Sequence, residues 1–366
     1  MLSRRGFVLG GVAAAGGAAA LSAWSYQRSA AVWRTAVEGT WRHAQSFSDS
    51  DMKVRRELIR YASLAPSSHN TQCWSFGIRN DAITIRPDLT RRCPVVDPDD
   101  HHLFISLGCA AENLLQAAPA FGLMGETVLE GPEKQIRIGL GPARSSQTEL
   151  FRAITERQST RSEYDGRKVD AAALRRLETC APVGDIQIVT DKSRIEKILE
   201  FIVEANTRQV EDHDFVEELV KWIRFSHGEA VATGDGLFSA TSGNPALPRT
   251  IGKAMFNLIF SAGSENDKYA RQVRSSAGLA IFSSERSDWQ HWFEVGRCFE
   301  RFALQAATLG IRNAHLNQPV EVPELRGQLA DYLGLGDRRP DLIVRFGYGA
   351  AMPRSLRRPI DEIIAA

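Results

Sequence analysis

The sequence predicts an α+β fold in which two tandem copies of one unit each form a mixed sheet flanked by helices. Two segments of the chain repeat. Leu58–Pro66 aligns with Leu174–Pro182, and Gly108–Gly122 aligns with Gly296–Gly310, an apolar, Ala-rich stretch bounded by glycines. Short strand patterns follow both stretches. Because self-similarity of this kind indicates a repeated architecture, we expect a duplicated chain.

Length and composition agree with two units of a globular protein. The chain of 366 residues is longer than a domain with a single hydrophobic core usually is. The 45 basic and 44 acidic residues nearly cancel, without a long basic run, so nucleic acid is not an expected partner. Five cysteines and eight histidines lack the spacing of a zinc site or a disulfide framework, and we expect no metal.

Residues 1–24 resemble a twin-arginine export signal or anchor. Arg4, Arg5 and Phe7 precede the uncharged Ala/Gly-rich run 8–23. We therefore expect export by that route to a periplasmic or membrane-anchored location, with the N-terminus as a membrane contact. An ordinary buried N-terminal helix is the alternative. Residues 25–51 are expected to be a linker; the alternatives are a helix that lies at the membrane interface and a helix packed on the body.

The first unit, residues 52–144, is expected to begin with a helix that ends before Pro66. A polar turn with Ser67, Ser68 and Asn70 follows, whose short side chains and free backbone N–H groups can hold a polar, planar ligand. The alternative is a capped connection that binds nothing. The remaining elements are predicted as strands at 75–79 and 82–86, a helix at 101–121 and strands at 123–129 and 135–140.

The second unit, residues 145–366, carries a basic cluster near its start. Arg157, Ser159 and Arg161 place three groups suited to phosphate oxygens within one turn, although a solvated helix end has the same pattern. An insertion at about 204–276 is expected to be a lid, an interface or a disordered segment. Strands are predicted at 186–189, 279–283 and 341–348, with a helix at 322–332.

Four motifs together resemble the flavin-dependent nitroreductase superfamily, most closely its Acg-type branch of fused, duplicated proteins. They are APSSHNTQ before Trp74, VDPDD with SLGCAAENLL at 96–115, RxSxR at 157–161 and RPDLIVRFGYG at 339–349. The resemblance covers roughly residues 52–366. It implies a nitroreductase-like fold in which the two halves form an intrachain pseudo-dimer.

The resemblance also implies a cofactor site for FMN shared between the halves. It assigns the phosphate to Arg157, Ser159 and Arg161, with Arg357 as a further contact. It assigns the ring and ribityl chain to Ser67, Ser68 and Asn70. Because the first copy lacks the arginine pair and the second copy lacks the serine turn, we expect one FMN per chain, in a monomer or a homodimer.

The expected function is that of an FMN-dependent oxidoreductase. Hydride or electrons would pass by a ping-pong route from a small-molecule donor to a small acceptor such as a nitro compound or quinone. No catalytic residue is assigned, because flavin chemistry needs no acid or base of a fixed type. The alternative is a protein that stores or sequesters FMN with little turnover.

Overall fold

The computed structural model describes residues 25–48, 50–79, 81–181 and 185–365. The predicted export signal falls on residues 1–24 and lies outside the described residues. Within the described ranges, no helix combines the length and apolar character needed to cross a membrane.

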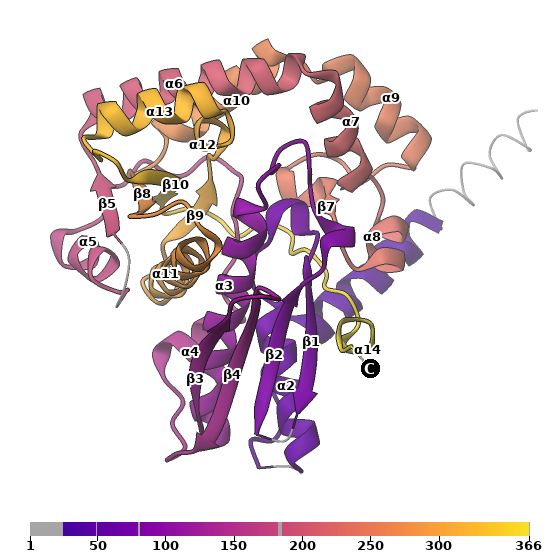
Figure 1. The fold of residues 1–366 in the computed structure, drawn as a ribbon. Helices are drawn as coiled ribbons and strands as arrows, with labels where there is room; N and C mark the ends of the chain where they lie inside the picture. The colour runs from indigo at the N-terminus through magenta and orange to yellow at the C-terminus, as the bar shows by residue number, and fades with distance from the viewer. Residues whose placement is uncertain (1–24, 49, 80, 182–184, 366) are drawn as a thin grey trace, which may run out of the picture.

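The structure contains two four-stranded sheets with the same connectivity; Figure 1 shows the first in the lower part of the molecule and the second at the upper left. The first has the order β1-β2-β4-β3 and the second β5-β8-β10-β9, so each places its four strands in the order first, second, fourth, third. The strands of the first sheet are β1 (Trp74–Arg79), β2 (Ala82–Pro87), β3 (Leu123–Glu130) and β4 (Gln135–Pro142); those of the second are β5 (Asp185–Val189), β8 (Gly278–Ser284), β9 (Arg312–His315) and β10 (Arg339–Gly347).

Neighbouring strands within each four-stranded sheet are antiparallel. Among the described residues, the parallel pairing on these two sheets consists of one bridge at an edge of each, between Phe76 and Ile364 in the first and between Ser159 and Asn313 in the second. The sheets are therefore mixed only at these edges. The predicted α+β class, with helices around two sheets, is confirmed.

The long helices α3 (His101–Ala117) and α11 (Trp289–Thr308) occupy the same place in the two copies and cross each other. A Cβ on Gly108 would lie 2.0 Å from the carbonyl oxygen of Phe293, and a Cβ on Gly296 would lie 2.0 Å from that of Ile105. Ile105 precedes Gly108 by three residues, as Phe293 precedes Gly296. The contact is thus reciprocal, as at a two-fold axis.

The N-terminus of α3 is capped by Asp97 and not by the N-cap residue Asp100. Asp100, at the N-cap, has φ +62° and forms no capping hydrogen bond. The Asp97 carboxylate instead accepts hydrogen bonds from the backbone N–H groups of His102 and Leu103, both at 3.0 Å. It satisfies two donors that the helix leaves free.

The second sheet is buried on both faces. Alternate residues of β8 enter two separate cores: Ala280 and Phe282 pack in the larger one, whereas Leu279 and Ile281 pack in the smaller one. Figure 1 shows α11 on one side of this sheet and, on the other, α6 (Lys192–Glu211) and α13 (Pro323–Leu333). Strands covered on both faces need a continuous apolar sequence rather than an alternating one.

The insertion is larger than predicted. Two residues connect β1 with β2, whereas residues 190–277 connect β5 with β8, so α6 belongs to the insertion although it begins before residue 204. The other elements of this segment are α7 (His213–Trp222), β6 (Ile223–Arg224), α8 (His227–Thr233), β7 (Leu237–Phe238), α9 (Arg249–Ile259) and α10 (Ala262–Arg274).

Residues 25–40 form a helix that belongs to the folded body, although this stretch was expected to be a linker. The Trp33 ring lies 5.3 Å from the ring of Phe238 in the insertion. Just beyond the helix, Trp41 Nε1 donates a hydrogen bond of 2.8 Å to the Ser355 carbonyl. Aromatic burial therefore attaches this stretch to both the insertion and the C-terminal segment.

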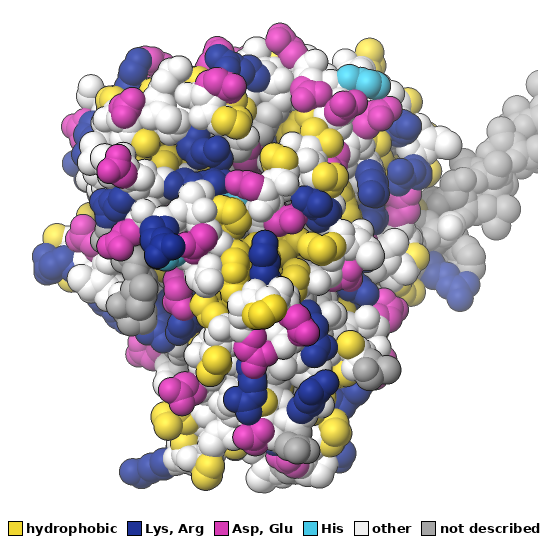
Figure 2. Space-filling view, in the orientation of Figure 1, with side chains coloured by type: hydrophobic (Ala, Val, Ile, Leu, Met, Phe, Trp, Pro, Cys, Tyr) yellow, Lys and Arg dark blue, Asp and Glu magenta, His cyan; other side chains and the backbone are white. Residues whose placement is uncertain are grey.

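Shorter elements complete the chain. These are α2 (Asp51–Ser63), α4 (Glu149–Ala153), α5 (Ala171–Glu178), α12 (Gln318–Glu321), α14 (Ile360–Ile363) and the 3-10 turns Ser68–Asn70, Leu89–Arg91, Ala118–Phe121 and Ser239–Ser242. On the face drawn in Figure 2, basic and acidic side chains are interspersed.

Candidate functional site

A cavity of about 500 Å³ lies where the two copies and the insertion meet. Its walls are the polar turn of the first copy, the start of the second copy and α7 and α9 of the insertion. Four of the seven predicted site residues line it, namely Ser67, Ser68, Ser159 and Arg161. This volume lies within the range of pockets that hold a small molecule or cofactor.

The polar turn of the first copy has a strained backbone. His69, Asn70 and Gln72 have φ values of +48°, +53° and +52°, in the left-handed region that residues other than glycine rarely adopt. Ser67 Oγ accepts a hydrogen bond of 2.9 Å from the Gln72 N–H and so closes the turn. Such strain is commonly held at binding sites, where it fixes the direction of nearby groups.

Arg161 gives the cavity an unpaired positive charge. No residue within the described ranges forms an ion pair or hydrogen bond with its guanidinium, and burial lowers the pKa of that group. The hydroxyls of Ser68 and Ser159 likewise have no hydrogen-bond partner among the described residues. A partly buried, unpaired cation beside free hydroxyls fits an anionic ligand such as a phosphate.

Arg157 does not line the cavity. Its Nε lies 3.1 Å from Glu300 Oε1, and its Nη2 donates a hydrogen bond of 2.9 Å to the Leu64 carbonyl. Burial raises the pKa of Glu300 to about 7. Arg157 Nη1 is buried without a hydrogen-bond partner in the described part of the chain. This arginine joins the two copies just behind the cavity wall.

Asn70 and Arg357 also lie outside the cavity wall. Asn70 Nδ2 donates to the carbonyls of Gly236 and Leu356, at 3.0 and 3.3 Å. Arg357 donates to three carbonyls at the C-terminal end of α2, those of Ser63, Leu64 and Ala65, at 2.7, 2.9 and 3.0 Å. Burial lowers the pKa of Arg357 to about 9. It satisfies carbonyls at the end of the helix.

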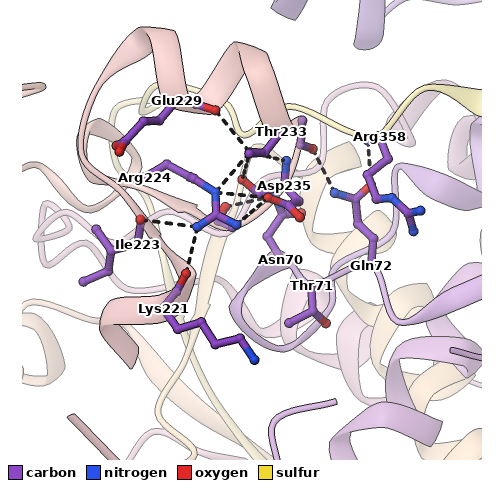
Figure 3. Close-up of polar contacts among 12 residues, drawn as sticks. Asn70, Thr71, Gln72, Lys221, Ile223, Arg224, Glu229, Thr233, Asp235 and Arg358 are labelled. Atoms are coloured by element: carbon purple, nitrogen blue, oxygen red, sulfur yellow. Dashed lines mark hydrogen bonds and ion pairs between the residues drawn. The ribbon is translucent and has the colours of Figure 1, made fainter. Parts of the chain in front are cut away.

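The insertion is attached to the polar turn by a polar network (Figure 3). Gln72 Nε2 donates to the Gly234 carbonyl at 2.9 Å, and the Gly236 N–H donates to the Asn70 carbonyl at 3.1 Å. Asp235, between the two glycines, forms ion pairs with Arg91 of the first copy and with Arg224. The insertion, which supplies α7 and α9 to the cavity wall, is therefore fixed to the polar turn.

Several cavity residues were not expected from the sequence. His102 Nε2 lies 3.4 Å from Glu321 Oε1, and both side chains line the cavity. His315 Nδ1 and Gln318 Oε1 also belong to lining residues and are buried without a partner among the described residues. His102 lies inside the 96–115 motif, but that motif does not mark it as a cavity residue, and His315 and Gln318 lie in no motif named above. The Ser159–Asn313 bridge brings this stretch to the basic cluster, and sequence spacing does not reveal such a bridge.

Comparisons with known proteins give two kinds of similarity. No protein-family model matches the chain. A provisionally assigned NAD(P)H nitroreductase of Mycobacterium tuberculosis, Rv3131, is 23% identical over 347 residues, covering 90% of this chain and 96% of the relative; MT3217 of a second strain gives the same values.

The solved structures match less of the chain. A nitroreductase with bound FMN from Bacteroides fragilis is 19% identical and covers 60% of this chain and 99% of its own, with a TM-score of 0.38. The FMN-dependent nitroreductase NfnB from Mycobacterium smegmatis, in complex with NADPH, is 12% identical, with coverages of 60% and 97% and a TM-score of 0.38.

Proposed function

We propose that the protein is an FMN-dependent oxidoreductase of the nitroreductase type, of the Acg-like fused branch, with one FMN between its two halves. The halves are residues 52–144 and 145–366. The observation that supports this most strongly is the free guanidinium of Arg161 in the same cavity as the Ser67–Ser68 turn of the other half. The names of the mycobacterial relatives agree with it.

The residues present fit FMN. In this proposal Arg161 and Ser159 hold the phosphate, while Ser67, Ser68 and the backbone of their turn contact the ribityl chain and ring. Arg157 and Arg357 add positive charge from behind the wall, and Asn70 fixes the turn rather than the ligand. When bound, FMN supplies hydride and one-electron transfer at its ring. The chain's own task is to bind and orient it and to limit access by water.

A small donor and a small acceptor exchange electrons in the cavity under this proposal. The unpartnered side-chain atoms of His315 and Gln318 are available to orient a polar group there. Apolar side chains of the insertion, including Phe215, Leu219 and Phe256, form the opposite wall. A nitro compound or a quinone combines an aromatic ring with polar oxygens and fits such a two-sided wall.

The second candidate is an FMN-storage protein with little turnover. The attachment of the insertion to the polar turn through Gln72 and Asp235 favours this function. An insertion fixed over the cavity restricts the exchange of substrates between the cavity and solvent. Stopped-flow mixing with NADPH, NADH or a quinol separates the two functions. Rapid reduction of bound flavin supports the oxidoreductase, whereas flavin that reacts only with dithionite supports storage.

Export is part of the same proposal. The twin-arginine pattern in residues 3–7 suits a protein that folds around its cofactor before transport, and a periplasmic or membrane-anchored location follows. Cell fractionation of the wild type and of a variant with both Arg4 and Arg5 replaced by Lys tests this. Retention of the variant in the cytoplasm is expected, and identical distributions would argue against export by this route.

Replacing Arg161 tests the site. Arg161→Gln removes the charge but keeps hydrogen-bond donors, and we expect it to weaken FMN binding by about 10- to 100-fold, as for loss of a charge-assisted hydrogen bond. Arg274→Gln is the matched control, because Arg274 is exposed and pairs with Glu196 on the surface. Unchanged FMN affinity in Arg161→Gln, measured by fluorescence titration of folded apoprotein, would refute the assignment.

A further inference from the structure

The outer face of α9 carries an apolar surface that is left in contact with solvent. Ile251, Met255, Leu258 and Ile259 are 52%, 38%, 87% and 58% exposed. Their spacing puts them on one side of a helix, the side that a helix of a soluble protein normally buries. Among the residues of α9, only Gly252 is buried. The helix therefore presents its apolar side outward.

This outer surface is continuous with the cavity. Met255 and Ile259 line the cavity and are also exposed, so they form part of its rim. On the inner side, Phe256 and Phe260 also line the cavity, and their rings stack at 4.4 Å. An apolar path therefore leads from the exposed face of α9 to the cavity wall.

The charges of α9 are all positive. Arg249 and Lys253 are its charged residues, and the helix contains no Asp or Glu. Arg249 reaches Glu229 of α8 at 3.1 Å, while Lys253 is exposed. An amphipathic helix with basic residues beside an apolar face is typical of proteins that lie on anionic membranes.

The first described residues of the chain lie on the same side of the molecule as α9. They belong to the helix at 25–40, whose Tyr26 and Trp33 rings lie 5.2 and 5.6 Å from His227 of α8. Figure 1 shows this helix beside α8, with α9 close by. The uncharged run 8–23 thus precedes a part of the chain that lies near α9.

We propose that α9 docks the protein on an anionic lipid bilayer, with its apolar face at the boundary between head groups and acyl chains. A second copy of the chain fits less well, because a two-fold contact through this short helix would bring the same cations together. A bilayer accepts both the apolar face and the basic residues.

The docked arrangement has a consequence that rests on the proposed function. The cavity rim at Met255 and Ile259 would then open at the acyl boundary. A quinone or quinol dissolved in the lipid would reach the cavity along apolar side chains without crossing water. The substrate class favoured by this geometry is therefore a lipid-soluble quinone.

Hydrogen–deuterium exchange of the full-length protein on vesicles tests the docking. Vesicles containing phosphatidylglycerol are expected to slow exchange of the amides in 249–259 about tenfold relative to vesicle-free protein. Vesicles of phosphatidylcholine alone are expected to bind the protein more weakly, by about fivefold in affinity for each basic residue that reaches the surface, and therefore to protect 249–259 less. The variant Leu258→Glu should lose the protection even if residues 1–24 keep it on the vesicle.

Met124→Glu is the matched control, because Met124 is 65% exposed and belongs to β3, a strand that lies far from α9 in Figure 1. It should keep the protection of α9. Equal exchange of 249–259 with and without vesicles would overturn the proposal, as would protection that depends on protein concentration alone, which indicates self-association. Flavin content measured in the same samples reports separately on the proposed function.

Discussion

The crossing of α3 and α11 supports a quantitative prediction about stability. In Gly108→Ala or Gly296→Ala, the new Cβ would lie 2.0 Å from a backbone carbonyl oxygen, whereas an ordinary C···O contact is about 3.3 Å. A backbone carbonyl cannot rotate away as a side chain can, so the helices must separate by about 1 Å. Overpacking of this kind costs about 3 kcal/mol, of which the better helix propensity of Ala offsets about 1.

Each variant should therefore lose about 2 kcal/mol or more, seen as a lower urea midpoint in a tryptophan-fluorescence titration of the full chain. The double variant should lose less than the sum, because the separation caused by one Cβ makes room for the other. Gly327→Ala is the control. Gly327 is exposed in α13 and its added Cβ would meet nothing within 4 Å, so a gain of about 0.5–1 kcal/mol is expected.

The explanation by reciprocal close packing would be refuted by either of two results. One is that Gly108→Ala and Gly296→Ala are as stable as Gly327→Ala. The other is that the losses of the two variants add fully in the double variant.

Two further predictions concern buried charges. Asp235→Asn leaves Arg91 and Arg224 without their shared carboxylate, so limited proteolysis should cut the insertion at least about tenfold faster; an unchanged cleavage rate would contradict its role as an attachment point. Burial raises the pKa of Asp341 to about 7 from 3.8, so folding favours its protonated form, and the resulting stability is lost as the pH rises through 7. In Asp341→Asn the side chain beside His101 stays neutral, so the urea midpoint should fall less between pH 5 and 8 than in the wild type. An equal fall in both proteins would show that Asp341 is not the cause of the pH dependence.

The fold was predictable where a local pattern decides the structure. Local strand patterns predicted β1 and β2, and the repeated glycines predicted that α3 and α11 are equivalent. The glycines also explain the close crossing of these two helices, because only a residue without a Cβ lets them approach so closely. The position of the insertion in the folded molecule was not predictable, because ion pairs such as Arg91–Asp235 join residues far apart in sequence.

The candidate site was predictable in type and only in part by residue. The two motifs predicted a basic group and a hydroxyl group meeting at one place, and Arg161, Ser159, Ser67 and Ser68 lie in one cavity. Spacing could not show that Arg157 turns inward, because its partner Glu300 lies on a distant helix.

The apolar wall of the cavity could not be predicted from the sequence either. Residues of α7 and α9 read as ordinary amphipathic helices, and only their packing over the cavity gives them a role. A helix pattern identifies an apolar face but not the surface that this face meets.

The most direct test of the central proposal is the number of flavins per chain. Protein purified with its cofactor is denatured, and the released FMN is measured by absorbance against the protein concentration. One FMN per chain is predicted, since the two halves supply complementary walls of one cavity. Two FMN per chain, or purified protein that neither contains nor binds FMN, would contradict a single site shared between the halves.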